Sequence, residues 1–271
     1  MLLLVVLFVI PTLSSFYFSL TRWTLFDAEF IGLDNFVTFF RDPQLFGSFR
    51  NTFWYATITS VGKVVAGLGL AILLNGRIIG RSYLRAVVFF PVLVSAVGIG
   101  ITFKVLLDPF DGLVNRVLAL VGLPGPGWLT DPALALTSVA LVDVWKGVGV
   151  SALIFMAGLV AIPRDYYEAA RLDGASNRRL FWSITLPLVR PAMTTVVLLN
   201  VISGLRSFEL VWTMTGGGPG FTSDVLGSVV YKQYQAGFYG LSTAGNVVLF
   251  LVVAVITVPM QIWFRRKEVQ Q

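Results

Sequence analysis

The chain has 271 residues, of which 56% are hydrophobic and only 13% are charged. The charged share is about half that of an ordinary soluble domain, and the mean hydropathy is +0.81. Such a composition cannot cover a water-exposed surface, and the same numbers exclude a disordered chain, a coiled coil and collagen. The composition therefore indicates a polytopic membrane protein.

The net charge is +6, and the sequence contains neither cysteine nor histidine. Without cysteine there are no disulfides, thiolate metal sites or cysteine nucleophiles, and without histidine the commonest general base and metal ligand is missing. A G-x-x-x-x-G-K-[ST] phosphate-binding loop is also absent. We therefore predict no catalytic, cofactor or metal site in this chain. We also predict no nucleic-acid binding, because most basic residues fall in a few short loops.

Six stretches are long and apolar enough to cross a bilayer, which takes about 20 residues of helix. They are about Leu2–Leu20, Phe53–Leu74, Ala86–Leu107, Leu134–Ile162, Ala192–Met214 and Thr243–Phe264. The first lacks the basic start and A-x-A site of a signal peptide, so we interpret it as a retained helix. The prediction is one all-α transmembrane domain over residues 1–271.

The basic residues divide unevenly between the two sides of the predicted bundle. Eleven fall on the side that holds both chain ends: Arg77, Arg81, Arg85, Arg164, Arg171, Arg178, Arg179, Arg190, Arg265, Arg266 and Lys267. Five fall in the opposite loops: Arg22, Arg41, Arg50, Arg116 and Lys232. Since cytoplasmic loops carry the excess of basic residues, both termini are predicted to be cytoplasmic.

The inner loop 163–190 is longer than an ordinary connector and has a helix pattern of its own. One short helix is predicted to start at Pro163, with Asp165 and Glu168 near its positive end and Gly174 as its stop. A second is predicted at about Asn177–Ile184. The pattern alone leaves two possibilities open, a surface that docks another protein and an amphipathic helix that lies on the lipid.

The loop contains Glu168-Ala169-Ala170, followed by Gly174, Ile184, Leu186 and Pro187. This pattern resembles the EAA loop of ABC importer permeases. Further segments are similar to the same family: Gly158–Pro163, Phe30–Phe36 and Thr215–Pro219. The last two resemble the carbohydrate-uptake branch, which includes the maltose and glycerol-phosphate permeases. The short basic tail that usually precedes the first span is missing, which is compatible with a truncated start.

The resemblance implies the type I ABC importer permease fold, with six transmembrane helices and a cytoplasmic coupling helix in a bacterial or archaeal cell membrane. It implies a transport subunit rather than an enzyme, with a second homologous permease, two ATPase subunits that carry ATP and Mg, and an extracytoplasmic solute-binding protein as partners. The residues that would dock the ATPase are Glu168, Ala169, Ala170, Asp173, Gly174, Ile184, Leu186 and Pro187.

Charged residues inside the predicted spans are the next signal. They are Lys63, Lys104, Asp143, Lys146, Arg206 and Glu209. Each costs several kcal/mol if it faces lipid, so a bundle interior or a wet cavity is expected. Asp143 and Lys146 are three residues apart and can share a helix face, as can Arg206 and Glu209. Local ion pairing and lining of a solute path both remain open for these pairs, whereas Lys104 is expected to reach toward the outer interface.

Sugar sites combine aromatic faces with hydrogen-bonding groups, and Trp145, Phe208, Trp212 and Asn246 offer both. The same aromatic residues could instead be bilayer anchors. The candidate translocation path comprises Asp143, Trp145, Lys146, Arg206, Phe208, Glu209, Trp212 and Asn246.

Two other classes of membrane protein would show different sequence features. A secondary transporter driven by an ion gradient predicts a carboxylate relay and inverted repeats with broken helices. Here only Asp143 and Glu209 are acids within the spans, and each has a basic neighbour. A membrane-embedded hydrolase would need a set of catalytic groups that this sequence does not offer.

Overall fold

The computed structural model of the protein describes residues 1–24, 26–76 and 79–268. Arg77, one of the predicted inner-loop basic residues, lies outside these described residues. The chain divides into two compact units. The first contains residues 1–56, 96–140 and 204–256, and the second contains residues 57–95, 141–203 and 257–271.

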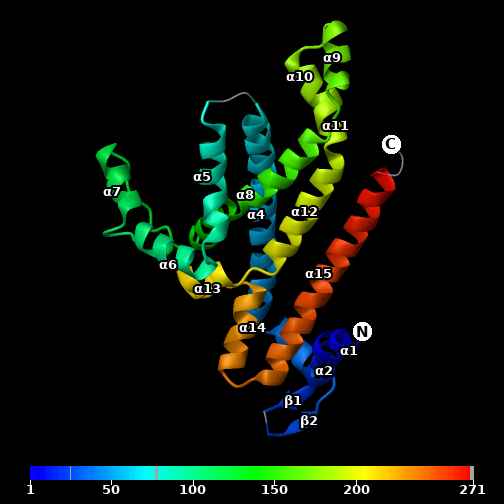
Figure 1. Ribbon diagram of the computed structural model, residues 1–271. Coiled ribbons are helices and arrows are strands. Elements are labelled where there is room, and N and C mark those ends of the chain that lie inside the picture. Colours follow the sequence, from blue (N-terminus) through cyan, green and yellow to red (C-terminus); the bar gives the residue numbers. More distant parts are fainter. Residues whose placement is uncertain (25, 77–78, 269–271) are drawn as a thin grey trace. The chain divides into compact units, whose positions relative to one another are not determined.

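Three of the predicted spans are single long helices (Figure 1). They are α4 (Pro43–Asn75), α8 (Ala135–Val160) and α15 (Tyr239–Glu268). Each is long and apolar enough to cross a membrane, the last over Tyr239–Arg266. Helix α4 starts well before the predicted Phe53, because Pro43 suits a helix start and Asp42 Oδ1 accepts the N–H groups of Gln44 and Leu45.

The predicted span Ala86–Leu107 is not one helix. Helix α5 (Arg81–Leu93) ends where Val94 adopts extended backbone, and α6 (Ala96–Leu106) begins after Ser95. Pro91 inside α5 has no N–H to continue the helical ladder, which weakens the last turn. A hydropathy pattern is continuous across such a break and does not detect it.

The predicted span Ala192–Met214 is also broken. Helix α12 (Arg190–Leu205) ends before Arg206, and α13 (Glu209–Thr215) begins after Phe208. At the other end, α12 is preceded by a helical run over Asn177–Leu188 that is bent by 67° against it.

The described helices supply three spans, or up to five when α5 with α6, and Asn177–Leu188 with α12, count as one span each. The apolar start of the chain is a shorter helical segment made of α1 (Leu2–Leu4), η1 (Val5–Val9) and α2 (Ile10–Phe18). The count of six spans therefore stays a prediction.

In the second unit, α8 approaches its neighbours through small residues. A methyl group on Gly67 of α4 would lie 2.7 Å from Ser151 Cβ of α8, and one on Gly158 of α8 would lie 2.6 Å from Ala192 Cβ of α12. Small residues let membrane helices pack at short distance. Around these contacts lies a buried apolar cluster of Ala71, Leu74, Phe155, Met156, Leu159, Ile162, Val189 and Val196.

The segment 163–190 of the second unit, predicted as an inner loop, forms two short helical arms, which lie beyond the end of α12 in Figure 1. The first is α9 (Arg164–Leu172), which starts directly after Pro163. The second runs through α10 (Asn177–Leu180), the π-helical turn η2 (Phe181–Thr185) and α11 (Leu186–Leu188). This second arm is longer than the predicted Asn177–Ile184, since it continues through Pro187 to Leu188.

The first unit holds a hairpin and several short helices. Strands β1 (Thr21–Trp23) and β2 (Ala28–Phe30) are antiparallel, with Thr21 opposite Phe30. They are followed by α3 (Asp34–Arg41), whose Asn35 Nδ2 donates at 2.9 Å to the carbonyls of Ser19 and Thr21. Helices α6, α7 (Leu113–Leu120), α13 and α14 (Leu226–Gln235) also belong to this unit. Its apolar core consists of Phe39, Leu45, Leu226, Val229 and Val248.

Two neighbouring glycines of α4 test the close helix packing. Gly67→Ala should lower the stability of the chain by about 1–3 kcal/mol, because the new methyl group overpacks the contact with Ser151. Gly69→Ala is the matched control, since nothing lies within 4 Å of its Cβ position. It should raise stability by about 0.5–1 kcal/mol by removing a helix-interior glycine. Thermal unfolding of the purified chains in detergent measures both, and equal shifts would contradict the packing argument.

Candidate functional site

The turn between α9 and α10 is built on Gly174, whose φ is +77°. The Gly174 N–H donates to the carbonyl of Arg171 at 3.0 Å, and the Ala175 N–H donates to that of Ala170 at 2.9 Å. These two bonds and the left-handed glycine define a Schellman helix end. The predicted helix stop at Gly174 is thus confirmed. Ser176 Oγ then accepts the Arg179 N–H at 3.4 Å and starts the next arm.

The predicted docking residues divide into four that are exposed to solvent and four that are half-buried. Glu168, Ala169, Asp173 and Gly174 are exposed, whereas Ala170, Ile184, Leu186 and Pro187 are half-buried. Tyr167 holds α9 from behind, because it packs on the apolar cluster of the second unit and its hydroxyl lies 3.1 Å from Thr185 Oγ1 of η2. The result is a short helix held in place with an exposed outer face.

Four predicted path residues gather in the first unit. Arg206, Phe208 and Asn246 line one cavity of about 340 Å³, hereafter the aromatic cavity. Trp212 stacks on Phe208 with ring centroids 5.9 Å apart. Four of the eight predicted path residues therefore lie close together in this unit.

Two tyrosines of α14 complete this group and were missed by the sequence reasoning. Tyr231 and Tyr234 also line the aromatic cavity. The Tyr231 ring lies 5.2 Å from Phe208 and 4.9 Å from Trp212, measured between centroids. The only signal in the sequence was the i, i+3 spacing of the two tyrosines, which places them on one face of a helix.

Arg206 and Glu209 do not share a helix face as predicted. Arg206 follows the end of α12 and Glu209 is the first residue of α13, so the helix is interrupted between them. Both side chains are exposed, and the described part of the chain shows no ion pair between them. Glu209 does not line the aromatic cavity.

Asp143 pairs with Lys63 of α4 and not with Lys146 of its own helix. Lys63 Nζ lies 2.9 Å from Asp143 Oδ2, and the two side chains are 4% and 15% exposed. Gly147 makes this possible, because a methyl group there would lie 2.7 Å from Lys63 Cε. Ion pairing of Asp143 with Lys146, one of the two possibilities left open by the sequence, is not found in the described part of the chain, and the charge pair links α4 to α8. Trp145 and Lys146 follow Asp143 on α8, and Trp145 is 46% exposed.

A second buried charge lies in the loop before α14. Asp224 Oδ2 accepts a hydrogen bond from Lys232 Nζ at 2.7 Å, and Asp224 Oδ1 accepts one from Ser228 Oγ at 2.8 Å. Burial raises the pKa of the Asp224 carboxyl above its ordinary value, while the bonds from Lys232 and Ser228 act in the opposite direction. Asn51 Nδ2 of α4 donates to the carbonyls of Thr222 and Asp224 at 2.9 Å each, which fastens this loop to α4.

No group of three or more acidic side chains that could hold a metal ion occurs within residues 1–24, 26–76 and 79–268. The aromatic cavity offers aromatic faces, the guanidinium group of Arg206 and the side-chain amide of Asn246. These groups can bind a polar solute without reacting with it.

Comparisons with known proteins are consistent with a transport role. The family model described as "Binding-protein-dependent transport system inner membrane component" matches residues 63–268. The trehalose/maltose transport system permease protein MalF of Thermococcus litoralis is 34% identical over 263 residues, which is 93% of this chain and 86% of that protein. The multiple sugar-binding transport system permease protein MsmF of Streptococcus mutans is 29% identical over 270 residues, which is 98% and 92% of the two chains.

The fold has a close counterpart among solved structures. A chain of a bacterial ABC transporter involved in alginate import matches with a TM-score of 0.87 and 24% identity, over 98% of this chain and 92% of that one. The family match covers most of the chain, and the relatives are permease subunits, which are transport components rather than enzymes. The chain therefore belongs to the family of inner membrane components of binding-protein-dependent transport systems, the ABC importer permeases.

Proposed function

We propose that this chain is a permease subunit that forms half of the path for a carbohydrate across a bacterial or archaeal cell membrane. It pairs with a second homologous permease, two ATPase subunits that carry ATP and Mg, and an extracytoplasmic solute-binding protein. The printed names of the relatives support the substrate class, since they include a trehalose/maltose, a multiple sugar-binding and an arabinooligosaccharide transport permease.

The aromatic cavity is the observation that carries the carbohydrate proposal. Sugars present apolar C–H faces that stack on aromatic rings and hydroxyls that need hydrogen-bond partners. Phe208, Trp212 and Tyr231 form a cluster of rings, and Arg206 and Asn246 supply donors and an acceptor beside them. These residues line the solute path in the proposal.

The other four path candidates do not line the aromatic cavity. Asp143, Trp145 and Lys146 lie on α8, where the charge of Asp143 is balanced by Lys63. Glu209 opens α13 near the aromatic cluster, because its neighbour Phe208 belongs to that cluster. They are kept as candidate contacts at other stages of transport.

The EAA loop is proposed as the coupling element in the cytoplasm. Its docking set of Glu168, Ala169, Ala170, Asp173, Gly174, Ile184, Leu186 and Pro187 would meet the ATPase. The small alanines and the exposed α9 favour close approach of a partner. The contact of Tyr167 with Thr185 would keep α9 in place when a partner binds. The domain is proposed to span the membrane six times, with both termini in the cytoplasm.

Secondary transport driven by an ion gradient is the alternative. It needs an acid that can exchange protons or bind a cation during transport. Asp143 is held by Lys63 at 2.9 Å, and the family match points to ATP-driven import.

The carbohydrate proposal is tested by uptake into proteoliposomes that contain the whole complex, with its binding protein outside and ATP inside. Tyr231→Ala should reduce the kcat/KM of sugar uptake about tenfold, a loss of about 1.4 kcal/mol, because the ring leaves the cavity. Tyr231→Phe should keep most of the uptake, since the stacking face remains. Tyr83→Ala on α5, another tyrosine outside the cavity, is the control. If the complex took up none of the sugars tested in an ATP-dependent way, the result would contradict the proposed substrate class.

The coupling role is tested by a matched pair of glycines. Gly174 and Gly80 have φ values of +77° and +78°, and nothing lies within 4 Å of either Cβ position. In the isolated chain, aspartate at either position should cost about 1–2 kcal/mol of backbone strain. In the complex, only Gly174→Asp should abolish ATPase co-purification and uptake, because only the loop that contains Gly174 is proposed to contact the ATPase. Equal behaviour of Gly174→Asp and Gly80→Asp would refute this assignment.

The orientation is tested with single cysteines, since the native sequence has none. Leu120 of the predicted outer loop is 86% exposed, and Ile79 of the predicted inner loop is fully exposed. An impermeant thiol reagent should label Leu120→Cys in intact cells and should label Ile79→Cys only after the membrane is opened. The reverse pattern would invert the topology.

A further inference from the structure

The aromatic cavity contains a positive charge that its own lining does not balance. Among the described residues that line the cavity, Arg206 is the only charged one. The guanidinium group of an arginine stays protonated in proteins. The cavity therefore carries a permanent positive charge, whatever solute enters it.

The acids closest to this cavity along the chain do not neutralise Arg206. Glu209 lies beyond the helix break, does not line the cavity and forms no ion pair with Arg206. Asp224, before α14, already accepts hydrogen bonds from Lys232 at 2.7 Å and from Ser228 at 2.8 Å. The described part of the chain thus supplies no counter-charge at the cavity.

Arg206 has no structural role that would explain its charge. It directly follows α12, whose last carbonyl groups have no partner inside the helix and could accept hydrogen bonds from an arginine. Within the described residues, however, the guanidinium group donates no hydrogen bond to these carbonyls or to any other group. Its donors are therefore free to meet a ligand.

The cavity lies at a depth where an unbalanced charge is costly. Its wall on α15 is formed by Asn246, seven residues after Tyr239, where the apolar span Tyr239–Arg266 begins. At about 1.5 Å per residue, Asn246 is about 10 Å along this span. An ionisable side chain at such a depth is expensive unless it is paired, and it commonly marks the path of a substrate.

The other polar groups of the cavity suit the uncharged part of a sugar. In the part of the chain that the structure describes, the amide of Asn246 and the hydroxyl of Tyr234 make no hydrogen bond. Ser242 Oγ is already used, since it donates to the Val230 carbonyl at 2.8 Å. The free groups can meet sugar hydroxyls while the ring of Tyr231 offers a stacking face.

We infer that the solute of the aromatic cavity is an anionic carbohydrate, whose negatively charged group pairs with Arg206 while its ring stacks on Tyr231. The inference rests on the proposed function, because it requires a sugar in this cavity. A guanidinium group donates two parallel hydrogen bonds to a carboxylate or a phosphate, so both groups have the required chemistry. A neutral sugar would leave the cation unbalanced, and Arg206 therefore determines specificity by charge.

The experiment is calorimetric titration of the purified complex, without the solute-binding protein, so that only the permease selects the sugar. The probes are glucose, glucuronate and glucose 6-phosphate. At least one charged sugar should bind the wild type about tenfold more tightly than glucose, and the tighter of the two identifies the preferred group. R206Q should abolish this preference and leave glucose binding unchanged, because glutamine keeps hydrogen-bonding ends without the charge. R206K should keep part of the preference, because the charge remains without the planar fork.

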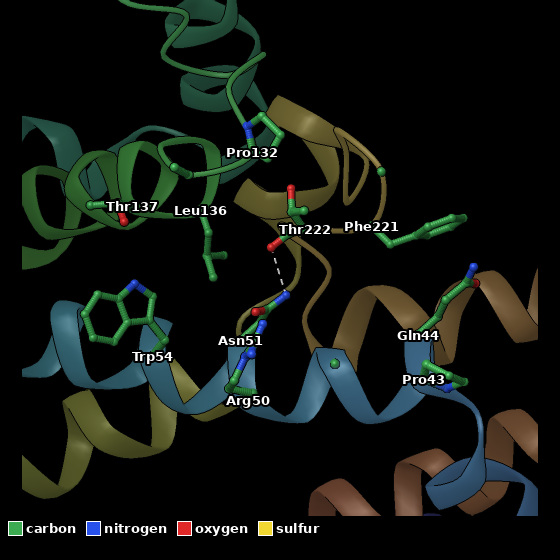
Figure 2. Close-up of a pocket in the computed structure, with 13 residues that line it drawn as sticks. Pro43, Gln44, Arg50, Asn51, Trp54, Pro132, Leu136, Thr137, Phe221 and Thr222 are labelled. Atoms are coloured by element: carbon green, nitrogen blue, oxygen red, sulfur yellow. Dashed lines mark hydrogen bonds between the residues drawn. The ribbon is translucent and has the colours of Figure 1, made fainter.

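Arg50 provides the matched control for Arg206. It is another exposed arginine of the first unit without an ion pair in the described part of the chain. It lines a different cavity, where Figure 2 shows it beside Asn51 and Trp54. R50Q should leave the affinities for all three sugars unchanged. Acetate and inorganic phosphate should bind the wild type more weakly than the charged sugars, because they have no ring to stack.

Equal affinity of the wild type for glucose and both charged sugars would overturn the inference and leave the proposed function intact. An unchanged preference in R206Q, with or without a lower yield of the complex, would also overturn it, because Arg206 would then act in assembly or not at all. Acetate or phosphate binding as tightly as the charged sugars would show a simple anion site and overturn it as well. A wild-type complex that binds none of the three sugars overturns the inference, and it overturns the proposed function too only if sugar uptake is also absent.

Discussion

The close approach of α8 to its neighbours is the constraint on which the second unit depends. Gly67 and Ser151 bring α4 and α8 together, and Gly158 and Ala192 do the same for α8 and α12. In an apolar solvent, burying large side chains between helices gains little, because lipid tails are as apolar as leucine. The favourable energy comes instead from dispersion contacts and hydrogen bonds, which require short distances. Small residues along α8 provide those distances.

Short distances also allow polar groups to be paired inside the unit. Lys63 can cross to Asp143 because Gly147 leaves room for its aliphatic stem. Between α8 and α12, Asn200 Nδ2 donates to Ser151 Oγ at 2.9 Å. A buried lysine without its carboxylate would be strongly destabilising. The glycines and the charges of this unit therefore depend on each other, and the pair fixes which face of α8 meets α4.

Features that depend on neighbouring residues in the sequence could be predicted, whereas contacts between distant residues could not. Helix existence follows from apolar length, so α4, α8 and α15 lie where hydropathy predicts them. The stop at Gly174 follows from local backbone chemistry, because few other residues adopt φ of +77° at low cost. The partner of Asp143 could not be predicted, since Lys63 is 80 residues away. The break at Arg206 was missed because the hydropathy of Ala192–Met214 hides a short polar interruption. Pro91 was a visible signal for the break after α5.

In the first unit, glycine and a buried charge depend on each other in the same way in the segment Thr215–Pro219. Gly216 and Gly217 have φ of +61° and +88°, and a methyl group on Gly217 would collide with Asp224. Thr215 Oγ1 lies 2.8 Å from Ser223 Oγ and closes the loop on itself. Glycine is thus required both for the left-handed turn and for the space that the buried carboxylate of Asp224 occupies. These residues form a scaffold rather than a contact surface. The side chain that this loop leaves exposed is Phe221. A change of ligand or partner among related chains should therefore be accompanied by substitutions at Phe221 and the residues after it. Substitutions of the glycines before it are restricted, because folding requires them.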